Sequence, residues 1–314
     1  TMAEPHGKPN DDEMNAMKAH LEEALAAGCV GFSVGLAYPT GNVAPTEELI
    51  ELAQVTAEHG GLYATHMRNE SDYVEQSVKE SLRIGREGGV PVVISHHKCG
   101  GKANWGKSEK TLALMDAAIA NGQSVHLDVY PYTASSTGLM ANFAKVAERV
   151  LVTEADGAPD QAGCYLDEIM ADWDCDLEAA VDRLLPAKAV YFQMSDQDLD
   201  RILAPPYCMV GSDGMPSDAH PHPRLWGTFP RVLGHYARHR KLFELGQAVR
   251  KITALPAECF GLADRGRIAV DMVADLVLFD PDKIIDRATY EMPERVSQGV
   301  EMVIAGGNVR YQAQ

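Results

Sequence analysis

The sequence predicts an α/β fold built on a parallel sheet, for which a barrel is the simplest closed form. Short apolar or β-branched runs recur with starts about 30 residues apart, the period of one strand plus one returning helix. The segments between them carry apolar residues at helical spacing. A length of 314 residues fits one such barrel or about two smaller domains.

The expected strands are 5 to 7 residues long and are bounded by turn-forming or polar residues. They cover residues 29–34, 61–66, 91–96, 124–130, 189–194 and 208–212.

Helices are expected between the strands. The first covers residues 12–27, and the next follows Thr46, which we expect to be an N-cap because Glu47 and Glu48 come directly after it. Val74, Val78 and Leu82 recur at i, i+4 and i+8, and the run from Leu112 through Met115 to Ile119 has the same helical period.

Two stretches depart from this period. Residues 139–188 are acidic and offer no strand at the expected place, which predicts a flap inserted on one loop of a barrel domain at 1–265. Residues 266–314 contain short strand-like runs at Arg267-Ile268, 275–280 and 301–307, separated by glycine turns. They predict the C-terminal strands of a small β domain.

Charge and cysteine content narrow the function classes. The chain has 28 Lys+Arg against 45 Asp+Glu, a net charge of −17, and no basic cluster, so nucleic acid and anionic membranes are not expected partners. No apolar run approaches the roughly 20 residues of a membrane span. None of the 6 cysteines forms a CxxC pair, and we expect reduced thiols and a cytoplasmic protein.

Three expected strands end in side chains that suit a metal ion, namely His66, His96 and Asp213. The C-terminal ends of parallel barrel strands meet at one face, so these residues become neighbours there. Imidazole and carboxylate groups suit zinc, and a catalytic zinc site has three protein ligands. A histidine taken alone is more often structural, but three coincident placements at strand ends indicate a metal site. His97 points to the opposite face and is not expected to share it.

Five segments of the chain resemble the zinc-dependent N-acyl-D-amino-acid deacylases (D-aminoacylases) of the amidohydrolase superfamily. They read ATHMRNE at 64–70, VVISHHK at 92–98, LDVYPYTASST at 127–137, MVGSDG at 209–214 and HPHPRLWGTFPRVLGHY at 220–236. The resemblance covers essentially the whole chain. It implies a metal-dependent hydrolase barrel, an active-site flap, and hydrolysis of N-acyl-D-amino acids to a carboxylate and a D-amino acid with Zn²⁺.

The resemblance also implies roles for single residues. His66 and His96 match the histidines that hold the tightly bound zinc, and Asp213 matches the general base and potential ligand of a second metal. Around the substrate, the matching positions are Tyr130 and Lys98 near the reacting carbonyl and carboxylate, Ser136 beside them, Arg224 gripping the carboxylate, and Met194 lining the pocket.

The sequence departs from the family's pattern at the N-terminal end. The family begins with strands of a small sandwich, a first barrel strand with an HxH metal motif and a cysteine ligand, and this chain matches none of them. We count about five of the eight strands that a barrel requires. The alternatives are a partner chain that carries the HxH and cysteine ligands, a missing segment, or a non-catalytic remnant that dimerises.

Two other functions remain open at this point. The chain can belong to an amidohydrolase that opens cyclic amides, although the YPY segment, the long insertion and the HPHPR loop fit the deacylases better. It can also be a binding or scaffold protein that kept the fold without the missing ligands. Zinc stoichiometry separates the scaffold from the enzymes.

Overall fold

The protein is described here by a computed structural model, which covers residues 2, 4, 6–216 and 219–313. Its core is a five-stranded parallel sheet in the order β1-β2-β3-β4-β8. The strands are β1 (Gly31–Gly35), β2 (Leu62–His66), β3 (Val92–Ile94), β4 (Val125–Val129) and β8 (Cys208–Val210). Each of them falls within or beside a run that the sequence predicts. The predicted α/β class with a parallel sheet is confirmed.

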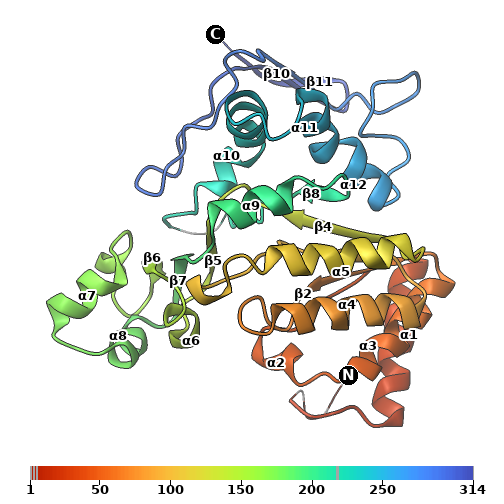
Figure 1. Ribbon diagram of the computed structural model, residues 1–314, viewed down its shortest axis with the longest axis horizontal. Coiled ribbons are helices and arrows are strands. Elements are labelled where there is room, and N and C mark those ends of the chain that lie inside the picture. Colours follow the sequence, from red (N-terminus) through yellow and green to blue (C-terminus); the bar gives the residue numbers. More distant parts are fainter. Residues whose placement is uncertain (1, 3, 5, 217–218, 314) are drawn as a thin grey trace.

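Helices cover one face of this sheet (Figure 1). They are α1 (Asp11–Ala26), α3 (Thr46–Glu58), α4 (Val74–Gly88), α5 (Ser108–Ala120) and α9 (Asp196–Leu203), with the short α2 (Pro39–Asn42) and η1 (Lys102–Asn104) in loops. The largest apolar cluster lies between these helices and the sheet; it includes Ala53, Val78, Met115, Ile94 and Leu127. This packing follows from the helical apolar spacing seen in the sequence.

The opposite face of the sheet has a smaller apolar cluster. Leu62, Val93 and Met209 point to this face and pack with Leu255 of α12 (Ala254–Cys259). Successive strand residues alternate between faces, so Tyr63 points to the helical side and Leu62 away from it.

One expected N-cap is wrong. Thr46 is the first residue of α3, whose N-cap position is occupied by Pro45. The Thr46 hydroxyl instead donates a hydrogen bond to Glu80 of α4 at 2.8 Å. Proline presets an extended approach to the helix, so the chain enters α3 without a capping side chain.

Residues 134–192, which include the segment predicted as a flap and are called the flap below, form a separate antiparallel sheet with its own helices, drawn at the left of Figure 1. Its strands pair in the order β5-β7-β6. They are β5 (Ala134–Gly138), β6 (Arg149–Ala155) and β7 (Ala187–Phe192), accompanied by α6 (Ala141–Ala144), η2 (Pro159–Gln161), α7 (Leu166–Trp173) and α8 (Leu177–Leu184). The sequence predicts no strand where β6 lies, and it predicts 189–194 as a strand of the main sheet. Both expectations are wrong, because β7 pairs only within the flap.

The C-terminal part begins with α10 (Arg224–Arg231), the π-helix η3 (Val232–His239), α11 (Leu245–Ile252) and α12. A three-stranded antiparallel sheet follows, in the order β11-β10-β9. Its strands are β9 (Leu276–Phe279), β10 (Val300–Ala305) and β11 (Asn308–Gln312). The strand expected at Arg267-Ile268 is absent from these described residues. None of the described helices combines the length and apolar character that crossing a bilayer requires.

Candidate metal centre and active site

The two predicted histidine ligands lie side by side at the C-terminal edge of the parallel sheet. His66 is the last residue of β2, and His96 follows β3 by two residues. Their ring centroids are 4.5 Å apart and nearly perpendicular. Pairing of β2 with β3 fixes this proximity, because Thr65 lies directly beside Ile94 in the parallel register. The sequence therefore predicted their proximity correctly.

His96 adopts a backbone conformation that is unusual for a residue with a side chain. Its φ is 39°, in the left-handed region. Its backbone N–H donates a 2.9 Å hydrogen bond to Oδ1 of Asp128, on β4, and the next N–H, of His97, donates to the Asp128 carbonyl. Asp128 thus holds the sharp turn after β3 that aims the His96 ring at the site. Burial raises the pKa of the Asp128 carboxyl.

Asp213 also has a positive φ, of 48°, three residues after β8. Its Oδ2 lies 2.9 Å from Nη1 of Arg224, at the start of α10. Arg224 is 1% exposed, and the Asp213 side chain is 43% exposed. Two of the residues that the sequence singled out therefore share backbone strain of the kind that clusters at functional sites.

Glu70 is a member of the site that the sequence analysis missed. With His66 and His96 it forms a group whose ligand atoms all lie within 4.8 Å of one another. Its Oε1 is 3.0 Å from His96 Nδ1, and its Oε2 is 3.6 Å from His66 Nε2. The ammonium of Lys98 donates to Oε1 at 2.7 Å. Glu70 lies in a loop, so no strand end marked it; the available signal was an acidic residue four positions after His66.

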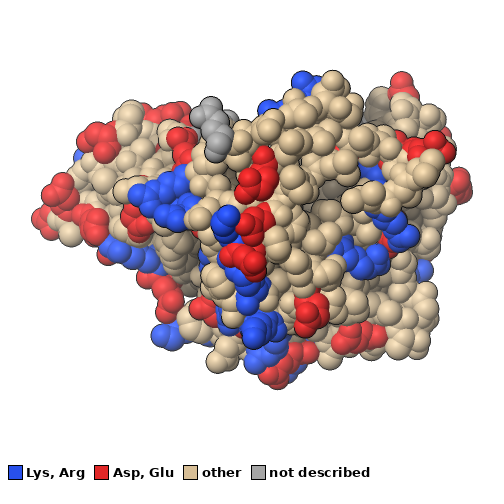
Figure 2. Space-filling view, turned by 90° about the horizontal axis from the view of Figure 1, so that it is seen from above, with Lys and Arg blue, Asp and Glu red and all other residues tan. Residues whose placement is uncertain are grey.

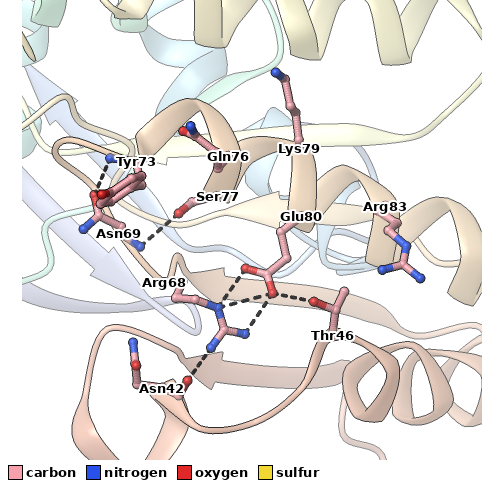
Figure 3. A pocket seen from close by; sticks show the side chains of 10 residues that line it. All are labelled: Asn42, Thr46, Arg68, Asn69, Tyr73, Gln76, Ser77, Lys79, Glu80 and Arg83. Carbon is pink, nitrogen blue, oxygen red and sulfur yellow. Dashed lines mark hydrogen bonds and ion pairs between the residues drawn. The ribbon is translucent and has the colours of Figure 1, made fainter.

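The loop that carries Glu70 is anchored on both sides (Figure 3). Arg68 pairs with Glu80 of α4 at 2.8 Å, and its guanidinium also donates to the Asn42 carbonyl, both drawn in Figure 3. A further bond runs from the Arg68 guanidinium to the Ala44 carbonyl. Asn69 Oδ1 accepts hydrogen bonds from the backbone N–H groups of Ser71 and Tyr73. These bonds tie the loop to α4 and to the segment before α3, and they leave Glu70 facing the histidines.

Burial and charge set the protonation of this group. Desolvation lowers the pKa of His66 to about 4, so the ring is neutral at physiological pH and has a lone pair for a metal. Burial opposes ionisation of Glu70, but Lys98 and the two imidazoles outweigh it and hold the pKa of Glu70 well below its usual range. The site therefore presents one carboxylate among neutral and cationic nitrogen groups.

The sheet and the flap together enclose what we call the flap cavity, with a volume of about 360 Å³. Its sheet side is lined by His66, Glu70, His96, Lys98, Tyr130 and Asp213, and its flap side by Ser135, Ser136, Thr137, Asn142, Phe143, Val146 and Gln193. A second space, the sheet-end cavity, has a volume of about 380 Å³ and lies at the strand ends. It is lined by residues 33–35, Ala64, Thr65, His66, Ser95, His96, Asp128 and Asp213.

Most other predicted site residues lie in or against the flap cavity. Tyr130 and Ser136 are buried, and their hydroxyl groups have no hydrogen-bond partner among the described residues. The Arg224 guanidinium stacks 4.5 Å from the centroid of the Tyr130 ring. Met194 packs against Tyr130 and Tyr132. Neither Met194 nor Arg224 is among the residues that line the two cavities.

The remaining histidines lie apart from this centre. His97 is fully buried and its Nε2 lies 2.9 Å from the Thr111 hydroxyl, on the helical side of the sheet. His220 and His222 lie before α10, and their Nε2 atoms contact the carbonyls of Tyr290 and Ala134. The prediction that His97 points away from the metal position agrees with this placement.

Known proteins resemble this chain along almost its whole length. Residues 2–311 match the model of the amidohydrolase family. The chain is 51% identical over 306 residues to an N-acyl-D-glutamate deacylase of Alcaligenes xylosoxydans xylosoxydans, covering 98% of this chain and 63% of that protein. It is 48% identical over 304 residues to a D-aminoacylase of the same organism, covering 97% and 63%.

A solved structure agrees with these relatives. The crystal structure of the N-acyl-D-glutamate deacylase from Bordetella bronchiseptica, complexed with zinc and a phosphonate mimic of the tetrahedral intermediate, superposes with a TM-score of 0.97. It shares 48% identity and covers 99% of this chain and 65% of that chain. This chain thus spans about 63% of the length of the curated relatives. With a family model matched over residues 2–311, the chain belongs to the amidohydrolase family.

Proposed function

We propose that this chain forms the catalytic part of a zinc-dependent hydrolase that cleaves N-acyl-D-amino acids into a carboxylate and a D-amino acid. The observation that carries the proposal is the convergence of His66, His96 and Asp213, from three strand ends, on the sheet-end cavity. Deacylase activity in the relatives and a zinc complex of the Bordetella bronchiseptica enzyme support it.

The donor set fits zinc. Two imidazoles and a carboxylate are the ligand types of catalytic zinc sites, and the low pKa of His66 keeps that ring in its ligating form. In the proposal, His66 and His96 hold the tight ion, and Asp213 touches it or a weaker second one. When bound, zinc lowers the pKa of water to about 7 and polarises a carbonyl oxygen.

The protein groups move the proton and stabilise charge. Asp213 accepts a proton from the attacking water and returns it to the leaving amine. Its exposed carboxylate borders both cavities, which supports this role. Tyr130 donates its unpartnered hydroxyl to the oxyanion, and because burial raises the pKa of that hydroxyl it keeps its proton.

Cationic and hydroxyl groups receive the substrate carboxylate. Lys98 and Ser136 line the flap cavity, and Arg224 lies behind it on the ion pair with Asp213. A guanidinium matches a carboxylate with two parallel hydrogen bonds, so the substrate competes with Asp213 for Arg224. Met194 shapes the pocket indirectly, by supporting Tyr130.

We also propose that the five parallel strands are the last five of an eight-stranded barrel, with residues 1–265 as barrel plus flap and 266–314 as strands of a small β-sandwich. The apolar inner face at Leu62, Val93 and Met209 supports a barrel interior there. In this proposal a further segment or partner chain supplies the other strands, an HxH motif and a cysteine ligand. A cytoplasmic location remains a prediction.

The test is hydrolysis of N-acetyl-D-amino acids and their L-enantiomers by this chain joined to, or mixed with, the remaining part of its protein. We expect D-selective release of amino acid that is lost on chelation and restored by zinc. Hydrolysis that ignores the chelator would contradict the metal, and equal rates on both enantiomers would contradict the substrate class.

A further inference from the structure

The flap strand β5 has a free edge, because among the described residues it pairs only with β7. The carbonyl of Thr133 and the N–H of Leu139 bond to β7 or to the residues that flank it. Backbone groups alternate between the two edges of an antiparallel strand, so the carbonyls of Ala134 and Ser136 face the free edge. Buried carbonyls on such an edge need donors from elsewhere.

Two side chains at the start of α10 supply these donors. His222 Nε2 lies 3.0 Å from the carbonyl of Ala134, and Arg224 Nη2 donates to the carbonyl of Ser136 at 3.2 Å. Both residues are buried, with 3% and 1% exposure. The donors are two residues apart, as the carbonyls are, so residues 222–224 bind the edge of the flap at two successive points.

Both ring nitrogens of His222 are engaged. Nδ1 accepts the backbone N–H of Arg224 at 2.9 Å, so the proton is on Nε2 and is donated to Ala134. Burial and the neighbouring Arg224 cation hold the pKa of His222 well below its usual range, so the ring is neutral. The ring also packs edge-on against Tyr132 and Tyr290, with centroids 5.2 Å away in each case. These contacts hold His222 in one orientation.

The guanidinium of Arg224 is located from both ends of its side chain. At the backbone end, the N–H of Arg224 has no partner within α10, and His222 accepts it. At the far end, Nη2 bonds to Ser136 and Nη1 lies 2.9 Å from Asp213 Oδ2. His222 acts on both ends, because it also binds the strand that carries Ser136.

We propose that His222 is a positioning residue, which holds the start of α10 against the edge of β5 so that Arg224 meets the substrate carboxylate. This inference rests on the proposed function, in which Arg224 receives that carboxylate. His222 is not among the residues that line the flap cavity or the sheet-end cavity, so it acts through Arg224 and not on the substrate. Its loss should raise KM for substrates that carry a carboxylate and leave zinc bound.

The first experiment is His222→Phe, which keeps a ring but loses both hydrogen bonds, in this chain joined to the remaining part of its protein. We expect KM for N-acetyl-D-amino acids to rise about 4- to 100-fold with a smaller change of kcat, because each hydrogen bond contributes about two- to tenfold. An N-acyl amine without a carboxylate should be affected much less. His220→Phe is the matched control, since the hydrogen bond of His220 goes to the carbonyl of Tyr290.

Two conservative variants separate the bonds and decide the matter if His222→Phe does not fold. The amide of His222→Gln reaches about as far as Nε2 and can donate to Ala134, whereas the oxygen of His222→Asn lies near the place of Nδ1 and can accept from Arg224. Each should raise KM about two- to tenfold. Equal losses on substrates with and without a carboxylate would overturn the proposal.

A double variant tests whether His222 acts through Arg224. In the Arg224→Lys background, His222→Phe should lower kcat/KM by far less than it does alone, because the contact that it positions is already lost. Additive losses would assign His222 an independent structural role and contradict the proposal.

A measurement without substrate keeps this inference apart from the proposed function. The Nε–H of Arg224 is buried, and Arg224→Lys assigns its ¹⁵N NMR signal. We expect slow exchange of this hydrogen with solvent in the unaltered protein and in His220→Phe, and faster exchange in His222→Phe. Unchanged exchange in His222→Phe would contradict the role of His222 in any case. Faster exchange in a protein that cleaves no N-acyl-D-amino acid would contradict only the proposed function.

Discussion

The parallel sheet and the flap line the same cavity but are built differently. The sheet supplies His66, His96 and Asp213 from strand ends that are held in register by neighbouring strands. The flap supplies Ser136 and its neighbours from an antiparallel sheet with a separate apolar core. The difference teaches that the geometry of the proposed metal site rests on the sheet, whereas the cavity-facing residues of the flap are held by a separate core.

The surfaces of the two regions differ as well. Asp and Glu side chains gather at the left-hand end of Figure 2, over the flap. Their ion pairs, such as Lys145 with Glu178 and Arg149 with Asp167, involve side chains that are at least 41% exposed. Such exposed pairs contribute little to stability. The flap therefore depends on its buried core.

The largest expected effect comes from removing a histidine from the sheet. We expect His66→Ala or His96→Ala to lose bound zinc and activity together, because solvent cannot replace a ligand at a strand end without a large loss of affinity. Metal content measured alongside turnover checks this. His59→Ala, which alters an exposed histidine, is the control. Unchanged zinc in either variant would remove that histidine from the site.

A smaller but still large effect is expected at Asp213. Asp213→Asn should lower the rate by about 10²- to 10⁴-fold, the usual contribution of general acid–base catalysis, while zinc stays bound to the histidines. The asparagine oxygen can still accept from Arg224, so the fold should be kept. Activity above a tenth of the original rate would rule out the role as base.

A substitution that leaves a cavity in the flap core tests whether the flap is stabilised independently of the parallel sheet. Leu184 is fully buried there, and Leu184→Ala should cost about 2 to 5 kcal/mol. If the regions are independent, hydrogen exchange will accelerate in β6 and β7 while β2 and β3 stay protected. Leu127→Ala, in the core of the main sheet, is the matched control and should expose the sheet amides. Equal loss of protection in both regions after Leu184→Ala would show one cooperative unit.

The sequence predicted the sheet better than the flap. The runs at β2, β3 and β4 are continuous apolar stretches between helical segments, which is the pattern of a parallel strand covered on both faces. The run at β7 has the same character, since Val190 and Tyr191 are also buried, but it pairs with β5 and β6. Burial shapes the composition of a strand, while its partner is decided by tertiary structure, so periodicity cannot assign it.

The site residues show the same contrast between what local sequence predicts and what tertiary structure decides. Strand ends located His66 and His96, because parallel topology brings such ends together. The sequence did not predict Glu70 as a site residue, because its contact with His96 spans 26 positions and depends on how a loop folds back over the sheet. The ion pair of Arg224 with Asp213 also could not be read from the chain, since it needs the placement of α10.

The smallest expected effect concerns Arg224, which joins the two regions: its Nη2 donates to the carbonyl of Ser136 in the flap and its Nη1 pairs with Asp213 after the sheet. Arg224→Lys keeps the charge but not the planar fork. It should therefore lower kcat/KM for N-acyl-D-amino acids about ten- to a hundredfold, corresponding to the 1.5 to 3 kcal/mol of a charged hydrogen bond.

An N-acyl amine without a carboxylate should lose much less in Arg224→Lys, because that substrate never uses the contact. Arg231→Lys is the matched control, since Arg231 ends the same helix, stacks on Tyr132 and pairs with Asp286 at 3.0 Å. It should affect both substrates equally and weakly. Equal losses on both substrates in Arg224→Lys would mean that this arginine acts by holding Asp213 in place. The substrate carboxylate would then be assigned to Lys98, a cation that lines the flap cavity beside the histidines.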